Sequence, residues 1–396
     1  MIGVEEALNI LEDNVTSLPG VQVDVDRAVG CVLAEDTYAT CDIPPFNQSS
    51  MDGYAFAFNS RTKGEAMEVK GEVPAGDSGS IRAETGKAVR IFTGARVPEG
   101  TDTVVMQEKT RQQGDLLYIA DEGLQPGGNV RQQGEEIRQG ELALPAGTLL
   151  TPAGIGFLSG VGIREVNVHP RPSIAIIVTG NELQKPGESL KPGQIYESNS
   201  SMLRAALSET GMHDVMVYTV EDNLEKLSAT IHECLKVHHV ILLTGGVSVG
   251  DYDFVVQAAT RCGVTRKFHK LRQRPGKPLY FGTKEQQVIF GLPGNPSSVL
   301  TCYYEYVWMV LQRLSGTERK LTRVRATLGT TVNKKNTLTQ FLKGSYAGGQ
   351  VIPLQGQESF RLRSFATANC LIRLGEEARM YEEGETVDVH LLPVYR

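Results

Sequence analysis

The sequence predicts a multidomain α/β protein in which a doubly wound α/β domain lies between β-rich segments. Three observations lead to this prediction. The chain has 396 residues, which at about 100–200 residues per domain indicates two to four domains. Strand and helix patterns alternate over residues 173–316 with short connections, as in a doubly wound sheet. On both sides of this region, short β-rich runs alternate with turns that contain Gly or Pro.

The segment before residue 169 has two parts. Residues 1–38 begin with an amphipathic helix from Val4 to about Val15, which an apolar, β-branched stretch follows. Residues 39–168 are typical of strands and turns, with a helix expected only at about 151–160. The sequence HPRP at 169–172 indicates a linker, because each Pro disfavours regular structure in its neighbour.

Within the α/β domain, strands and helices follow from hydrophobic periodicity. Asp222 with Glu225 predicts a capping box, and Asn295 with Pro296 predicts a second helix start. Strands are expected at 173–180, 215–220, 240–244, 265–271, 278–282 and 287–292, and helices at 201–209, 222–235, 252–262 and 296–314. After about Leu321, five short segments with partial alternation predict a small β barrel or sandwich.

Composition excludes several classes of protein. The 40 Lys and Arg residues against 46 Asp and Glu residues give a net charge of −6, which disfavours a general binder of nucleic acid or membrane surfaces. No apolar run approaches the roughly 18 residues of a membrane span. The six cysteines form no CxxC pair, so neither a structural zinc site nor a disulfide framework is expected. A start rich in acidic residues does not resemble a signal peptide, and a cytoplasmic location is expected.

Four unusual loops follow strands of the α/β domain, where ligands bind in such sheets. They are residues 179–182, the Gly-rich segment 244–251 with Asp253 behind it, the basic segment 266–278 and the segment 291–296. The Gly-rich segment matches neither a dinucleotide fingerprint nor a P-loop. The basic segment, with six Lys and Arg and no acid, is either an edge strand protected by charge or an oxyanion clamp.

In the functional interpretation, Lys277 and Arg274 hold a phosphate or another oxyanion. Glu182, Asp222 and Asp253 lie on the facing loops, and carboxylates beside bound phosphate are typical of Mg²⁺-assisted reactions. Which of the three carboxylates binds the metal is left open. The histidines form no HxH or HExxH pattern, so a transition-metal site is not expected.

Eight motifs then occur in one order along the chain: PPFNQSSMDGYA, RIFTGARVPEG, VVMQE, TGNEL, IYESN, TGGVSVGDYD, RPGKPLYFG and GLPGNP. In this order they resemble the MoeA family, the molybdopterin molybdenumtransferases, which are related to the E domain of gephyrin. The resemblance extends from about residue 1 to residue 395.

The resemblance implies an elongated homodimer with four domains in each chain. Domain I would be helical and split between 1–38 and 140–168, and domain II would be the β-rich insert 39–139. Domain III, the α/β molybdopterin-binding domain, would span 169–318, and the C-terminal β-barrel-like domain IV would span 319–396. The reaction implied inserts molybdenum from molybdate into adenylylated molybdopterin and releases AMP with the help of Mg²⁺. A molybdopterin adenylyltransferase and molybdoenzyme chaperones would be partners.

The resemblance also implies roles for individual residues. Those expected to be catalytic are Asp52, Glu182, Asp222, Asp253 and Lys277, with Glu182, Asp222 and Asp253 as metal ligands. Those expected to bind substrate are Thr93, Gly245, Gly246, Ser248, Arg274, Pro293, Pro296, Lys343, Ser359, Arg361 and Ser364. The sequence departs from the family pattern at Glu358 and Phe360, which stand where relatives have small residues in the segment linked with molybdate.

Three other functions compete with molybdenum insertion. A molybdopterin adenylyltransferase shares the α/β domain, but it usually has about half this length and lacks the MDGYA and GLPGNP motifs. A non-enzymatic scaffold of the gephyrin E-domain type would use the same fold without catalysis. A nicotinamide-hydrolysing relative with the same core fits the flanking domains poorly.

Overall fold

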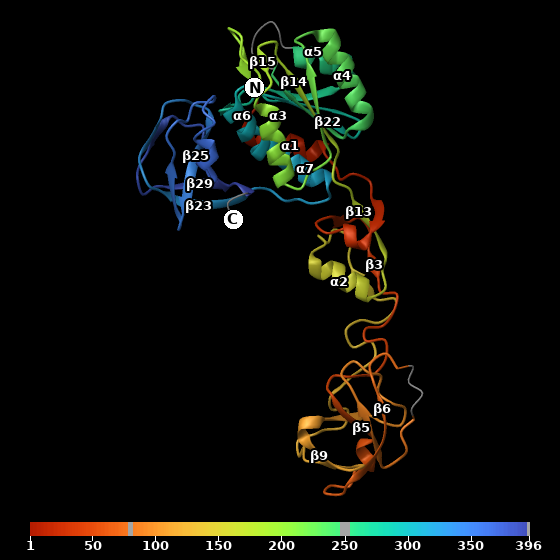
Figure 1. The fold of residues 1–396 in the computed structure, drawn as a ribbon. Coiled ribbons are helices and arrows are strands. Elements are labelled where there is room, and N and C mark those ends of the chain that lie inside the picture. Colours follow the sequence, from red (N-terminus) through yellow and green to blue (C-terminus); the bar gives the residue numbers. More distant parts are fainter. Residues whose placement is uncertain (78–81, 246–253, 394–396) are drawn as a thin grey trace. The chain divides into compact units, whose positions relative to one another are not determined.

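The computed structural model describes residues 1–77, 82–245 and 254–393. The chain divides into two compact units (Figure 1). Unit 1 comprises Met1–Val21 and His169–Arg396, and unit 2 comprises Gln22–Val168. Among the helices that the structure describes, none is long and apolar enough to cross a membrane.

The central sheet of unit 1 has the strand order β17-β14-β18-β22-β21-β19. Its strands are β14 (Ile174–Thr179), β17 (Val215–Val220), β18 (Val240–Thr244), β19 (Thr265–His269), β21 (Tyr280–Lys284) and β22 (Gln287–Leu292). The first four strands in this order run parallel, whereas β21 is antiparallel to both of its neighbours. The sheet is mixed because a tight hairpin joins Lys284 to Gln287, with Glu285 at a φ of 52°.

Helices cover both faces of this sheet, which confirms the predicted α/β class. The helices of unit 1 are α1 (Val4–Asn14), α3 (Asn199–Glu209), α4 (Leu224–Val237), α5 (Phe254–Arg261), α6 (Pro296–Cys302) and α7 (Trp308–Leu314). Successive side chains of a strand point to opposite faces. Ile174 and Ile176 therefore pack with α1, α3, α6 and α7, while Ala175 and Ile177 pack with α4 and α5.

Helix α1 belongs to unit 1, although the resemblance grouped residues 1–38 with 140–168. Its apolar face, which includes Val4, Leu8 and Leu11, is buried in the same cluster as Ile176 and Leu311. Periodicity predicts such a face but does not indicate which surface covers it. Residues 22–38 and 140–168 both lie in unit 2, which also contains residues 39–139.

The start of α4 differs from the predicted capping box in a way that bears on Asp222. Asn223 is the N-cap, and its Oδ1 accepts hydrogen bonds from the backbone N–H groups of Glu225 and Lys226, both at 3.0 Å. Because Asn223 fills this role, the Asp222 carboxylate is not used as a cap.

The helix that begins at Pro296 continues to Leu314 through a π-helical turn, Tyr303–Val307. Within that turn the buried Glu305 carboxylate contacts Nδ1 of buried His390, with distances of 2.9 and 2.8 Å to its two oxygens. His390 lies on the C-terminal strand β29 (Thr386–Leu391). The pair therefore joins the α/β part of unit 1 to its C-terminal β part.

The C-terminal part is a small closed barrel, one of the two forms that the sequence pattern predicts. Its strands are β23 (Thr322–Leu328), β25 (Thr339–Ala347), β26 (Gln350–Pro353), β27 (Cys370–Leu374) and β29. The ring closes because β25 pairs with both β26 and β27. A short strand of the basic segment, β20 (Gln273–Arg274), pairs with β25. A second pair is formed by β24 (Val332–Lys334) and β28 (Arg379–Tyr381).

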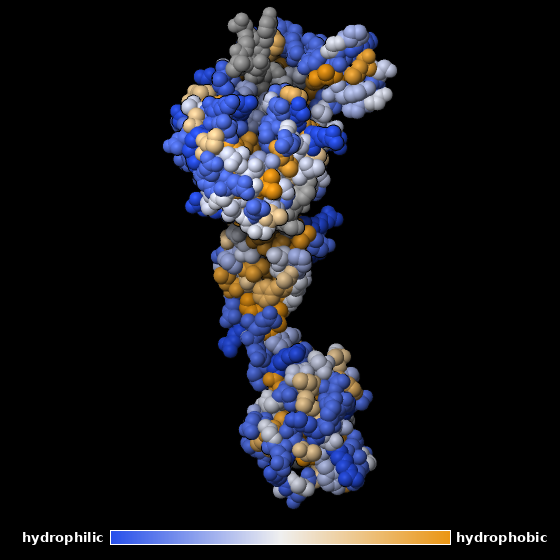
Figure 2. Space-filling view, turned by 90° about the vertical axis from the view of Figure 1, so that its left-hand side faces the viewer, coloured by the Kyte–Doolittle hydropathy of each residue, from blue (hydrophilic) through white to orange (hydrophobic). Residues whose placement is uncertain are grey.

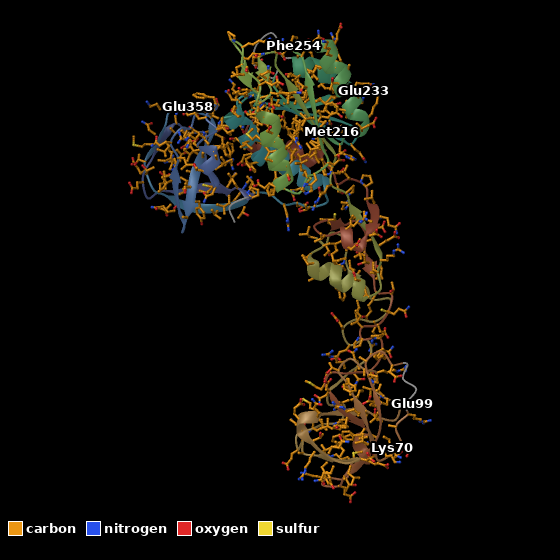
Figure 3. All side chains as sticks on the ribbon, in the orientation of Figure 1. Lys70, Glu99, Met216, Glu233, Phe254 and Glu358 are labelled. Atoms are coloured by element: carbon orange, nitrogen blue, oxygen red, sulfur yellow. The ribbon has the colours of Figure 1, made fainter. Side chains whose placement is uncertain are left out.

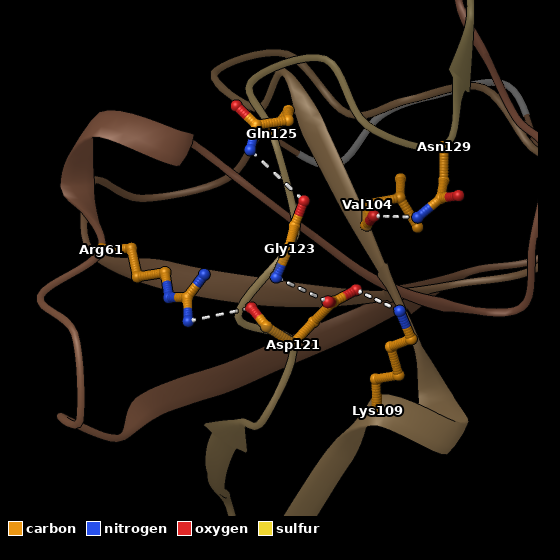
Figure 4. Close-up of polar contacts among 7 residues, drawn as sticks. All are labelled: Arg61, Val104, Lys109, Asp121, Gly123, Gln125 and Asn129. Carbon is orange, nitrogen blue, oxygen red and sulfur yellow. Dashed lines mark hydrogen bonds and ion pairs between the residues drawn. The ribbon is translucent and has the colours of Figure 1, made fainter.

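Unit 2 is mostly β structure. Its larger sheet has the order β8-β5-β7-β6-β10-β9. The strands are β5 (Gly53–Phe56), β6 (Met67–Val73), β7 (Lys87–Ile91), β8 (Thr103–Met106), β9 (Thr110–Gln113) and β10 (Leu116–Ile119). Figure 4 shows how Asp121 stabilises a loop beside this sheet: its carboxylate accepts from Lys109 Nζ at 3.0 Å and from the Gly123 N–H at 3.1 Å.

The rest of unit 2 has short strands and one described α-helix. The strands are β1 (Val21–Asp24), β2 (Val32–Leu33), β3 (Thr37–Tyr38), β4 (Gln48–Ser49), β11 (Val130–Arg131), β12 (Leu142–Leu144) and β13 (Glu165–His169). Helix α2 (Pro152–Gly160) begins at Thr151, whose Oγ1 accepts from the Gly154 N–H at 3.2 Å. This helix is apolar along its length, but Leu158 is its one fully buried residue.

Candidate active site

A cavity of about 870 Å³ opens at the carboxyl ends of β14 and β18 in unit 1. Its walls come from the ends of these strands, the turn at 273–278, the segment Pro293–Pro296 and the barrel loop Gln357–Phe360. The cavity therefore lies where the topology of an open α/β sheet predicts a ligand site.

Opposite charges meet in this cavity. The basic side chains Arg274 and Lys277 line it together with the carboxylates Glu182 and Asp222. Of the six cations in the basic segment, only these two are among the lining residues. Arg272, for example, pairs instead with Glu376, at 3.3 Å. Cations and carboxylates thus line the same cavity, as expected. The cations come from the turn at 273–278 and not from the whole basic segment.

Hydrogen bonds from Gln273 hold the turn that carries Lys277. The sequence did not indicate this residue. Gln273 is fully buried, and its Nε2 donates to the carbonyl oxygens of Pro275 and Gly276 at 3.0 and 3.2 Å. Its Oε1 accepts from the Tyr306 hydroxyl. A polar residue within a polar run carries no signal that it will be buried, so only the structure identifies it.

Asn199 joins three walls of the cavity. Its Nδ2 donates to Thr244 Oγ1 at 2.8 Å and to the Gly294 carbonyl at 2.9 Å. Two acceptors in the lining, Asn199 Oδ1 and Thr179 Oγ1, are buried and have no hydrogen-bond partner among the described residues. Buried polar atoms are rarely left unsatisfied, so these atoms indicate where a polar ligand would bind. Asn199 lies in the IYESN motif, which could have indicated it.

The barrel residues expected to bind substrate differ in position. Ser359 lines the cavity, and its Oγ accepts from Asn295 Nδ2 at 2.8 Å. Arg361 and Ser364 line a neighbouring cavity of about 720 Å³. Lys343 is buried, and its ammonium group donates to the carbonyls of Gly356 at 2.7 Å and Arg361 at 2.9 Å. Burial lowers the pKa of Lys343.

The other expected site residues fall into three groups. Gly245, Pro293 and Pro296 line the cavity with the charged residues. Gly246, Ser248 and Asp253 lie outside the described residues. Asp52 and Thr93 belong to unit 2. There the backbone N–H and the hydroxyl of Thr93 both donate to Asp52 Oδ1 at 2.7 Å, and these hydrogen bonds lower the pKa of Asp52.

Three family models match the chain in sequence order. Residues 2–162 match the MoeA N-terminal region (domain I and II), residues 175–313 a probable molybdopterin binding domain, and residues 325–392 the MoeA C-terminal region (domain IV). A molybdopterin molybdenumtransferase of Staphylococcus epidermidis is 32% identical over 98% of this chain and 95% of its own length. The chain belongs to the MoeA family of molybdopterin molybdenumtransferases.

Other MoeA family members agree with this assignment. The molybdopterin molybdenumtransferase of Staphylococcus aureus is 31% identical over 98% of this chain and 95% of its own. The crystal structure of the molybdopterin biosynthesis MoeA protein from Pyrococcus horikosii has a TM-score of 0.84 and 31% identity, and the match covers 99% of each chain. The likeness therefore extends over both units and is not confined to the α/β domain.

The carboxylates of the cavity are the candidate ligands for a metal ion among the described residues. Within them, no group of three His, Cys, Asp or Glu side chains is close enough to hold a metal ion. Glu182 and Asp222 nevertheless line one cavity with Arg274 and Lys277. Mg²⁺ is usually held by one or two carboxylates together with phosphate oxygens of the substrate, so two carboxylates in a cavity suited to anions fit this ion.

Proposed function

We propose that this chain inserts molybdenum from molybdate into adenylylated molybdopterin and releases AMP. The observation that supports this most directly is a single cavity in which Arg274 and Lys277 lie with Glu182 and Asp222, in a chain of the MoeA family. The volume of about 870 Å³ is within the usual range for a small-molecule site.

In this proposal the basic side chains act on the phosphoanhydride of the substrate. Breaking its P–O bond leaves additional negative charge on the departing AMP phosphate. The Arg274 guanidinium can donate two parallel hydrogen bonds to phosphate oxygens, while Lys277 supplies a compact charge. Fixed charges directed at the site of charge development are usually the largest contribution to catalysis.

Glu182 and Asp222 would hold Mg²⁺ in this cavity, and we expect Asp253 to join them. When bound, Mg²⁺ would neutralise charge on the phosphate oxygens. Removal of Mg²⁺ with EDTA should abolish AMP release, and added Mg²⁺ should restore it. Replacing Asp253 with Asn should leave the far-UV circular dichroism spectrum unchanged and abolish molybdate-dependent AMP release. Unchanged release by this variant would rule out the role of Asp253.

The role of Lys277 can be tested against a matched control. Lys277→Met should lower kcat/KM for molybdate-dependent AMP release by about 100-fold, within the range for removal of one stabilising group at a reacting centre. Lys267 lies in the same basic segment but does not line the cavity, so Lys267→Met should stay within about twofold of the parent. Equal effects would indicate that only the general charge of the segment matters.

The alternatives give different products. An adenylyltransferase would convert ATP and molybdopterin into the adenylate, whereas this chain should consume the adenylate only when molybdate is present. A non-enzymatic scaffold would do neither and would not complement a mutant that lacks molybdate insertion. Titrating AMP release with molybdate and with tungstate would identify the oxyanion used.

We also propose that the chain acts as a homodimer through the part of unit 2 that carries α2. Figure 2 shows apolar side chains gathered on this part of unit 2, where α2 buries only Leu158 completely. Nearby, Leu142 on β12 is 47% exposed. Apolar surface of this kind is typical of obligate interfaces.

Light scattering after size exclusion tests the dimer. Leu142→Glu should shift the molar mass from that of a dimer towards that of a monomer, because a charge at the interface is poorly solvated. Leu116→Glu is the matched control, since Leu116 is 45% exposed but lies on β10 of the larger sheet. A monomeric parent protein would contradict the proposal.

A further inference from the structure

An exposed aromatic ring lies at the rim of the active-site cavity. Phe360 is 62% exposed, and it lines both the main cavity and the neighbouring cavity of about 720 Å³. Its loop includes Glu358, which Figure 3 labels on the barrel part of unit 1. An aromatic side chain gains free energy when it is buried, so an exposed ring beside a ligand cavity calls for an explanation.

The loop that carries Phe360 is held on both sides of the ring. On one side, the Ser359 carbonyl accepts from the Ser297 N–H at 3.1 Å and Ser359 Oγ accepts from Asn295 Nδ2 at 2.8 Å. On the other side, the Arg361 carbonyl accepts from buried Lys343 Nζ at 2.9 Å. The ring is therefore exposed although hydrogen bonds hold the loop on both sides of it.

A charged group lies over the ring, which still stays largely exposed. The Arg361 guanidinium carbon lies 5.6 Å from the centroid of the Phe360 ring, within the distance of a cation–π contact. Arg361 is itself paired with Glu358, at 3.0 Å. An exposed apolar ring beside an ion pair of Arg361 and Glu358 suits a flat ring with polar edges, which can stack on the phenyl group and form hydrogen bonds at its rim.

We propose that Phe360 stacks on a planar nitrogen-containing ring of the substrate and contributes to its binding. This inference rests on the proposed function, whose substrate carries two such rings, the adenine and the pterin. Stacking on an aromatic side chain tolerates any flat heteroaromatic ring. Stacking requires no hydrogen bond, and a phenyl group has no atom that could form one.

Steady-state kinetics of molybdate-dependent AMP release test the role of the ring. Phe360→Ala and Phe360→Leu should each raise KM for adenylylated molybdopterin roughly tenfold, the loss expected for one stacking contact, with kcat within about twofold. Phe360→Tyr keeps the aromatic face and should behave as the parent. Ile352→Ala is the matched control, because Ile352 is 47% exposed on the barrel but lines neither cavity.

Fluorescence identifies which ring is stacked. The chain has one tryptophan, Trp308, which is only 7% exposed, so Phe360→Trp adds a reporter at the rim that can be compared with the parent. Quenching by AMP alone would support stacking on adenine, and quenching by a free pterin alone would support stacking on the pterin. If neither quenches and Phe360→Ala retains the parental KM, the proposal is wrong.

These outcomes are separate from the fate of the proposed function. If the parent protein releases AMP in response to molybdate but Phe360→Ala and Phe360→Leu have the parental KM, the proposed function stands and the stacking role is wrong. A parent protein that releases no AMP would lose the function, while quenching of the Phe360→Trp variant would still report binding of the ring.

Discussion

Two buried polar side chains position the loops around the cavity. Gln273 holds the turn of Pro275 and Gly276, and Lys343 holds the loop through the carbonyls of Gly356 and Arg361. Lys343 was expected to bind substrate, but its ammonium group is occupied by these carbonyls. We therefore propose that Lys343 contributes through the shape of the loop.

Lys343→Met should destabilise unit 1 by about 1–3 kcal/mol, because the carbonyls of Gly356 and Arg361 would lose their buried donor. Denaturant unfolding measures the change. Lys335→Met, which replaces an exposed lysine of the same barrel, should change the free energy of unfolding by no more than about 0.5 kcal/mol. Equal stability of the two variants would show that Lys343 is not needed for the loop.

A second prediction at this scale concerns pH. Nδ1 of His239 accepts from the Ser173 N–H at 3.1 Å and also contacts Ser173 Oγ at 2.8 Å. Burial lowers the pKa of His239. The unfolded chain therefore binds a proton more readily than the folded one, so this contribution to stability is complete above the unfolded pKa of about 6.5 and is lost as pH falls through the folded pKa.

The parent protein should thus have a lower Tm at pH 5.5 than at pH 7.5. In His239→Asn the side-chain oxygen can still accept from Ser173 but does not titrate, so the fall in Tm should be smaller. An equal fall in both proteins would assign the pH dependence to other groups, among them His238, whose pKa burial also lowers.

At the scale of elements, the active site depends on how tightly its turns pack against helices. Gly276 has a φ of 86°, and a Cβ placed there would lie 2.5 Å from Cys302 Sγ on α6. The turn that presents Arg274 and Lys277 therefore requires glycine both for its conformation and for its contact with the helix.

Gly276→Ala should destabilise the protein by more than the roughly 1–3 kcal/mol expected for a non-glycine residue in the left-handed region. It should also raise KM, because the turn must move. Gly193→Ala provides the comparison, since Gly193 has nearly the same φ, 85°, and a Cβ placed there would meet nothing within 4 Å among the described residues. If both variants lose the same stability, the contact with α6 is unimportant.

At the scale of the whole molecule, each unit has separate hydrophobic clusters. Phe56 is fully buried in unit 2 and Phe290 is fully buried in unit 1. Where two cores share few contacts, each can unfold as a cooperative unit of its own.

Calorimetry should therefore resolve two unfolding transitions. Phe56→Ala should lower one of them, with a loss of about 3–5 kcal/mol for a truncated buried aromatic ring, and Phe290→Ala should lower the other. A single transition that both variants shift together would mean that the two units unfold as one.

Sequence alone determined the α/β class and the main strands of the α/β part of unit 1, because burial and periodicity are local properties of the chain. It also indicated Glu182, Asp222, Arg274 and Lys277, which share one cavity. The tertiary structure decided which charges and rings face that cavity. It separated Arg274 and Lys277 from the rest of the basic segment, buried Gln273 and Lys343, and left Phe360 at the rim. It also placed α1 in the core of unit 1. These outcomes depend on contacts between residues far apart in the chain, and a polar or apolar pattern does not specify its partner.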